Sequence, residues 1–151
     1  MGFVFLRARY VRKHKEMRSH VKIHSISENH LYKKVYDHGK KYVCQHIVVY
    51  VLTDYHASRL QRENPLKMKI NRVGLAVSKK LGGAVIRSRV RRILRTAYTR
   101  LEEEYDVKKG YLVVIVARSS AISVKSTDIY ENMIEAMSNL NMIENGVPNA
   151  Q

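Results

Sequence analysis

The fold is decided by residues 72–95, which read RVGLAVSKKLGGAVIRSRVRRILR. Apolar residues alternate with small or polar ones over residues 73–77, and this pattern predicts a β-strand. A turn at Gly82-Gly83 follows, and a helix is expected from about residue 84 to residue 104. A strand, a glycine turn and a long basic helix in succession indicate a domain that mixes α and β structure.

The predicted helix is amphipathic, and its polar surface is basic. Five arginines lie within residues 87–95, and no acidic residue follows until Glu102. Solvated helix faces usually mix both signs, because like charges at i,i+4 destabilise a helix by roughly 0.2–0.5 kcal/mol per pair. The stripe of Arg87, Arg91 and Arg95 therefore predicts phosphate binding, which the planar guanidinium suits. The apolar arc expected to pack on a sheet contains Ile86, Val90, Ile93, Leu94, Ala97 and Leu101.

Charge is distributed unevenly along the chain. Of 151 residues, 28 are Lys or Arg and 13 are Asp or Glu, which gives a net charge of +15. Residues 59–100 hold thirteen of the basic residues and one acidic residue, whereas residues 101–151 are net acidic. Such a basic face predicts a polyanionic partner, either nucleic acid or an anionic membrane surface. The membrane ranks lower, because the basic helix is expected to bury its apolar face within the domain.

The flanking sequence extends the α/β pattern in both directions. Ser27 is expected to cap a first helix and Gly39 to end it. Residues 42–53 are rich in β-branched and aromatic residues on both faces, which is typical of a central strand. The elements expected around the basic helix are a helix at 27–38, a strand at 42–53, a loop at 54–70, a strand at 111–117 and a helix at 127–141.

Composition also bounds the surroundings of the domain. Residues 1–22 carry seven basic residues and one acidic residue without a clear period, which favours a flexible arm over a docked helix. One domain is expected over residues 23–142, followed by a frayed tail at 143–151. Cys44 is the only cysteine, and no apolar run approaches the ~20 residues of a membrane span. These features predict a cytoplasmic protein.

The central stretch resembles the signature of the bacterial ribonuclease P protein subunit. That signature is a strand ending in Ser-Lys-Lys, a glycine-containing turn, and an Arg-Asn-Arg box followed by further basic residues. The resemblance covers about residues 23–140, with two departures: Ser88 stands in place of the box Asn, and Gly83 in place of the turn Asn. The RNA-binding residues that the resemblance implies are Lys79, Lys80, Arg87, Ser88, Arg89, Arg91, Arg92 and Arg95.

The resemblance implies a specific fold and function. The fold would be an α/β (α+β) two-layer sandwich similar to a domain of ribosomal protein S5, with a single four-stranded sheet, elements in the order αβββαβα and a left-handed βαβ crossover. The protein would bind the catalytic RNA of ribonuclease P and precursor tRNA, and assist removal of the tRNA 5′ leader. Hydrolysis would be performed by Mg²⁺ ions held by the RNA, so the protein alone would be inactive.

Three tyrosines match aromatic residues of the family's leader-binding cleft. Tyr32 and Tyr36 share one helical stripe, and Tyr50 lies on the long strand. From composition alone, buried core positions would be the simpler interpretation. The matched spacing favours the cleft instead, where aromatic faces would stack leader bases with little sequence preference.

Other function classes find less support in the sequence. A structural RNA-binding protein, such as a ribosomal protein, would share the basic helix but would need no leader cleft. A stand-alone nuclease would need converging carboxylates, whereas the acidic run at residues 102–106 falls at a helix end. The seven histidines fit no zinc-binding spacing. We therefore expect no catalytic residue, no metal site and no small-molecule substrate on the protein.

Overall fold

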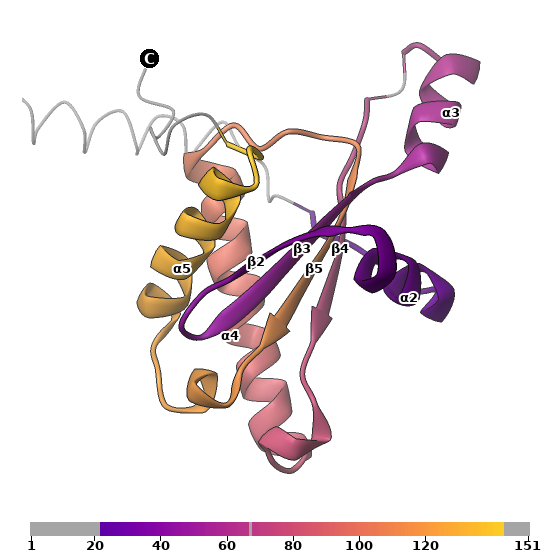
Figure 1. The fold of residues 1–151 in the computed structure, drawn as a ribbon. Helices are drawn as coiled ribbons and strands as arrows, with labels where there is room; N and C mark the ends of the chain where they lie inside the picture. Colours follow the sequence, from indigo (N-terminus) through magenta and orange to yellow (C-terminus); the bar gives the residue numbers. More distant parts are fainter. Residues whose placement is uncertain (1–21, 67, 144–151) are drawn as a thin grey trace, which may run out of the picture.

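One mixed β-sheet organises the chain. The structure, a computed structural model, describes residues 22–66 and 68–143. The sheet has five strands in the order β1-β4-β5-β3-β2, with helices on both of its faces (Figure 1). The strands are β1 (His24–Ser25), β2 (Lys40–Val43), β3 (Ile47–Thr53), β4 (Arg72–Ala76) and β5 (Tyr111–Ala117). The helices are α2 (Asn29–His38), α3 (Tyr55–Glu63), α4 (Ala84–Glu104) and α5 (Ser126–Asn139), with 3₁₀ turns η1 (Lys79–Leu81) and η2 (Ser119–Ile122).

The two faces of the sheet have separate apolar cores. Helices α4 and α5 cover one face, where the larger core includes Ile47, Val113 and Ile115. Helix α2 crosses the other face over a smaller core around Val35 and Val114 (Figure 1). The alternation of side chains along β3, β4 and β5 sends successive residues into one core and then the other.

The predicted α/β sandwich is confirmed, with one additional strand. The four strands that the family resemblance implies correspond to β2, β3, β4 and β5, and the two-residue β1 adds a fifth beside β4. Strands β4 and β5 pair in parallel, and the basic helix α4 connects them. The predicted bounds of α4 and β5 agree with the structure, and α5 was expected within about two residues of its observed ends.

Several local predictions were wrong. The single strand predicted at 42–53 is the hairpin of β2 and β3, broken where the Cys44 amide donates to the Ile47 carbonyl across 2.8 Å. The loop predicted at 54–70 contains helix α3. Glu28, not Ser27, is the N-cap residue of α2, whereas Gly39 ends the helix as expected. Ile86 is 39% exposed, because it lies beside Gly82 in the first turn of α4 and not over the sheet.

The ends of the chain lie mostly outside the described residues. The basic arm expected at 1–22 and the tail expected at 143–151 overlap the described part only at Lys22 and Ile143. Across residues 22–66 and 68–143, no helix combines the length and apolarity that crossing a bilayer would require.

Candidate RNA-binding site

Helix α4 is anchored to the domain by one buried stripe. Helix α5 packs alongside it: Arg100 lies 4.1 Å above the Tyr130 ring, and the Tyr130 hydroxyl donates to Glu104. With its apolar side fixed in this way, α4 presents the remaining side chains in a set direction. The buried residues are Val90, Leu94, Ala97, Tyr98 and Leu101.

Four arginines within residues 87–95 of α4 remain free of carboxylates, and three of them, Arg87, Arg91 and Arg95, share one flank of the helix. Arg92 and Arg95 are exposed, and Arg87 and Arg91 are half-buried. Among the described residues, none of these four forms an ion pair, and the buried Nε of Arg87 has no hydrogen-bond partner. We call Arg87, Arg91, Arg92 and Arg95 the arginine surface. Their charges are available to an external anion.

One arginine of the predicted box faces elsewhere. Arg89 is exposed, and its Nη1 donates to the Ile122 carbonyl across 3.1 Å, so it lies toward the η2 turn. Ser88 is exposed on the helix surface. The structure therefore separates Arg89 from the arginine surface, although the sequence places all of them within nine residues.

The turn before α4 brings two lysines to the start of the helix. Lys79 and Lys80 form η1 and are both exposed, and Ser78 caps this turn by accepting from the Lys80 amide. Gly82 has φ +148°, a conformation that side chains rarely permit, so glycine is required there. Gly83 is the N-cap of α4 with open space around it, so α4 forms without a capping side chain.

The three predicted tyrosines meet on the α2 face of the sheet. The rings of Tyr36 and Tyr50 contact edge to face, with centroids 5.0 Å apart and planes at 80°. Tyr32 lies directly on Gly74 of β4, where an added Cβ would come within 2.6–2.8 Å of its ring and hydroxyl. Burial raises the pKa of Tyr36, as do the neighbouring Tyr32 and Tyr50. We call Tyr32, Tyr36 and Tyr50 the aromatic strip.

The register of the sheet explains why these rings come together. Tyr50 pairs with Val114, and Val114 pairs with Gly74, so the three residues form one row across β3, β5 and β4. Helix α2 lies over this row, with Val35 fully buried against it. The neighbouring row of Val48, Val116 and Ala76 is half-buried. Partly exposed apolar surface therefore continues beside the aromatic strip.

The aromatic strip and the arginine surface approach each other at the edge of β4. Strand β1 pairs only with Arg72 and Val73, so the rest of β4 has no strand on its outer side within the described part of the chain. Burial raises the pKa of Tyr32, and the positive charge of Arg91 opposes this rise. Arg91 is thus close enough to act on the Tyr32 hydroxyl around this edge.

Comparison with known proteins decides the family. A model of the Ribonuclease P family matches residues 21–141. The chain belongs to the ribonuclease P protein family. The ribonuclease P protein component of Clostridioides difficile is 38% identical over 98 residues, covering 65% of this chain and 75% of the relative. That of Alkaliphilus oremlandii is 32% identical over 125 residues, covering 83% and 97%.

Solved structures of ribonuclease P proteins share the fold. The Staphylococcus aureus protein superimposes with a TM-score of 0.64 at 20% identity, covering 82% of this chain and all of that one. The Thermotoga maritima protein gives 0.58 at 18% identity, covering 74% and 92%. The family match and the curated relatives make this chain a subunit of the tRNA-processing ribonucleoprotein endoribonuclease P, and its partner in that complex is RNA.

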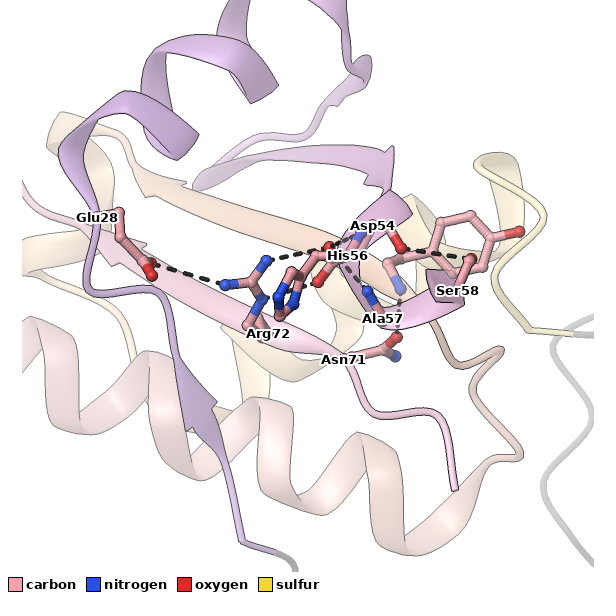
Figure 2. A network of polar contacts seen from close by, with 8 residues as sticks. Glu28, Asp54, His56, Ala57, Ser58, Asn71 and Arg72 are labelled. Carbon is pink, nitrogen blue, oxygen red and sulfur yellow. Dashed lines mark hydrogen bonds and ion pairs between the residues drawn. The ribbon is translucent and has the colours of Figure 1, made fainter. Parts of the chain in front are cut away.

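Sequence reasoning missed one polar network in this ribonuclease P subunit. The Arg72 guanidinium bonds both carboxylate oxygens of Asp54, at 2.8 and 3.0 Å, and its Nη1 lies 3.6 Å from Glu28 (Figure 2). Asp54 is only 3% exposed and also caps α3, accepting from the amides of His56 and Ala57. An Asp followed by helix-forming residues was the available signal for this cap.

The acidic residues of α4 have structural partners. Glu102 accepts from the Tyr98 hydroxyl across 2.6 Å and pairs with Lys109 at 3.1 Å. Glu104 pairs with Arg100 at 3.0 Å. The acidic run therefore fixes the end of α4 in the ribonuclease P fold. Within residues 22–66 and 68–143, no group of three or more His, Cys, Asp or Glu side chains is placed to hold a metal ion.

Proposed function

We propose that this subunit binds the catalytic RNA of ribonuclease P through the arginine surface, aided by Lys79, Lys80, Ser88 and Arg89. The observation that carries this proposal is the set of four arginines on α4, three of them on one flank, that form no ion pair among the described residues. Bidentate guanidinium–phosphate contacts and counterion release favour an RNA backbone at such a surface.

The aromatic strip is the proposed site for the single-stranded 5′ leader of precursor tRNA. Stacking on an aromatic face contributes about 1–3 kcal/mol per base and tolerates any base, which suits leaders of varied sequence. Tyr36 is 41% exposed and meets Tyr50 edge to face, so part of the strip faces solvent. A structural RNA-binding protein would not need this arrangement, and so it favours the leader role.

Two further parts of the proposal concern the setting of the reaction. Mg²⁺ is assigned to the RNA component, where it would supply the hydrolytic chemistry, and the protein would supply positive charge and leader contacts. A cytoplasmic location is proposed because the single cysteine, Cys44, suits a reducing compartment. Burial raises the pKa of the Cys44 thiol to about 11, so it is poorly reactive at neutral pH.

Replacing Arg87, Arg91 and Arg95 together with Ala tests the RNA contact. We expect weaker binding of a bacterial ribonuclease P RNA, because contacts to its phosphates are lost. With each lost contact fewer counterions are released, so binding also depends less on salt. The slope of log K against log salt should flatten by roughly 0.7–0.9 per lost contact. The measurement is a filter-binding or anisotropy titration at several salt concentrations.

A charge-matched control is available at other sites on the protein. Lys40, Lys41 and Lys108 are exposed, and the first two lie on β2, the opposite edge of the sheet from β4. Their joint replacement with Ala removes the same charge and should change the slope less. If both triple variants gave equal slopes, net charge alone would explain binding and the arginine surface would lose its assignment.

A further inference from the structure

Arg72 joins three elements at one end of the sheet. It is the first residue of β4, and its side chain reaches Asp54 at the cap of α3 and Glu28 at the cap of α2 (Figure 2). We call Asp54, Arg72 and Glu28 the Arg72 bridge. The bridge is a side-chain contact that ties the start of α2 to the sheet, beside the backbone hydrogen bond from the Ile26 amide to the Val73 carbonyl of β4 at 3.1 Å.

The bridge lies in the row of the sheet next to the aromatic strip. Arg72 pairs with Leu112, and Leu112 pairs with Leu52, so these three residues form a row that adjoins the row of Gly74, Val114 and Tyr50. Arg72 is two residues from Gly74, on which Tyr32 lies. The bridge is therefore on one side of α2, and the half-buried row of Val48, Val116 and Ala76 is on the other.

A second contact braces the same side of α2. The Lys34 ammonium lies 5.7 Å from the centroid of the Tyr55 ring, at the start of α3. Helix α3 buries none of its own side chains, so its cap is the part that is firmly attached. Both contacts on this side of α2 therefore depend on Asp54, which fixes the cap through Arg72.

We propose that Arg72 is a positioning residue for leader binding, holding α2 through Glu28 so that Tyr32 and Tyr36 stay in place over Gly74 and Tyr50. This inference rests on the proposed leader role of the aromatic strip. Arg72 touches no nucleotide in this scheme. It acts by fixing the distance between the α2 rings and the sheet, on which the stacking of a base depends.

The two halves of the bridge differ in a way that makes the proposal testable. The Asp54–Arg72 half is buried and bidentate, so breaking it would leave a buried charge without its partner. The Glu28–Arg72 half is longer, and the Glu28 side chain is 46% exposed. Glu28→Gln therefore releases α2 from the bridge while leaving the buried pair intact.

The experiment uses holoenzyme reconstituted with a bacterial ribonuclease P RNA. The dissociation constants for leader-bearing precursor tRNA and for mature tRNA are measured with wild-type protein and with Glu28→Gln, Arg72→Lys and Tyr36→Ala. Glu63→Gln is the matched control, because it removes another exposed ion pair, that with Arg59 on α3. Thermal unfolding and affinity for the RNA subunit are measured for every variant.

We expect Tyr36→Ala to weaken binding of leader-bearing precursor about tenfold, the loss of one stacked base, with mature tRNA unchanged. Glu28→Gln and Arg72→Lys should lower the ratio of affinity for leader-bearing precursor to affinity for mature tRNA by a smaller factor, about threefold. Neither variant should change the affinity for the RNA subunit, and Glu28→Gln should unfold at the wild-type temperature. A role confined to stability would move the unfolding temperature and leave the ratio unchanged.

Two outcomes separate the proposals. If Tyr36→Ala lowers the ratio but Glu28→Gln and Arg72→Lys leave it at the wild-type value, Arg72 is no positioning residue and leader binding at the strip stands. If Tyr36→Ala itself has no leader-specific effect, the leader assignment is wrong, and the role of Arg72 is overturned with it.

Discussion

At the scale of single residues, Gly74 shows how one missing side chain shapes the aromatic strip. The Tyr32 ring occupies the space that a Cβ at Gly74 would need, with three ring and hydroxyl atoms within 2.8 Å of it. A glycine inside a strand commonly marks such a close approach. Gly74 is buried and pairs with Val114 within an unbroken register of β4 and β5. Its role is therefore to admit the ring and not to bend the strand.

Gly74→Ala is predicted to displace Tyr32 and to destabilise the fold. Overpacking of this kind costs about 1–3 kcal/mol, and the flexible tyrosine should place the effect near the lower end. In a Tyr32→Ala background the same substitution should cost much less, because the space is then free. The measurement is a double-mutant cycle of urea unfolding free energies.

Gly83 provides the control for this glycine. No atom lies within 4 Å of a Cβ built there, and the backbone of this N-cap is extended. Gly83→Asn should leave stability unchanged or raise it by a few tenths of a kcal/mol, because Asn can cap α4. Equal losses at both glycines, or additive losses in the cycle, would show that Tyr32 does not depend on Gly74.

At the scale of elements, helices with buried faces were predictable and the exposed helix was not. The bounds of α4 followed from Gly82-Gly83 and from an apolar stripe that the core indeed buries, including Leu94 and Leu101. Helix α3 has no buried residue, so no apolar period distinguished it from a loop. Its formation depends on the Asp54 cap and on Arg72, which is 18 residues farther along the chain.

The candidate site likewise has residues that the sequence identified and contacts that only the tertiary structure shows. The arginine stripe was found from its spacing, because spacing on a helix fixes which residues share a face. The tyrosines were found because they match the aromatic residues of the family's cleft. The meeting of Tyr32 with Gly74, and of Arg72 with Glu28, depends on where α2 crosses the sheet. That placement is a tertiary property, and the local pattern of residues 27–38 does not contain it.

Asp54→Asn is predicted to destabilise the protein by about 2 kcal/mol at pH 7. Asn keeps the capping oxygen but loses the charge that pairs with Arg72. Burial raises the pKa of Asp54, but the hydrogen bonds and charge of Arg72 outweigh it, with help from the Ala57 and His56 amides, and the folded-state pKa is lowered. The measurement is urea unfolding of both proteins at neutral and acidic pH.

The lowered pKa fixes the direction of the pH dependence. A carboxyl group whose pKa falls on folding stabilises the protein above its unfolded-state pKa of roughly 4, and that stability is lost as pH falls through the lower folded value. The stability difference between wild type and Asp54→Asn should therefore narrow below about pH 4. A difference that stayed constant down to pH 2 would show that the charge of Asp54 contributes nothing.

At the scale of the whole molecule, positive charge and aromatic surface occupy adjoining parts of one edge. The arginine surface lies on α4, on one side of the sheet, and the aromatic strip lies under α2 on the other (Figure 1). They approach each other around β4, where Arg91 acts on Tyr32. The catalytic RNA proposed for the arginine surface and the 5′ leader proposed for the aromatic strip would therefore meet at this edge of the sheet.

This arrangement predicts how the protein changes the metal requirement of the holoenzyme. RNA and precursor tRNA are both polyanions, and Mg²⁺ and the basic protein both neutralise their repulsion. With a bacterial ribonuclease P RNA at low Mg²⁺, leader cleavage should require both components, and the protein alone should leave precursor tRNA intact. The Mg²⁺ concentration for half-maximal cleavage should rise when Arg87, Arg91 and Arg95 are replaced with Ala, and less when Lys40, Lys41 and Lys108 are. Cleavage by the purified protein without RNA would contradict the assignment of the chemistry to the RNA. An unchanged Mg²⁺ requirement in the arginine variant would contradict the assignment of charge neutralisation to α4.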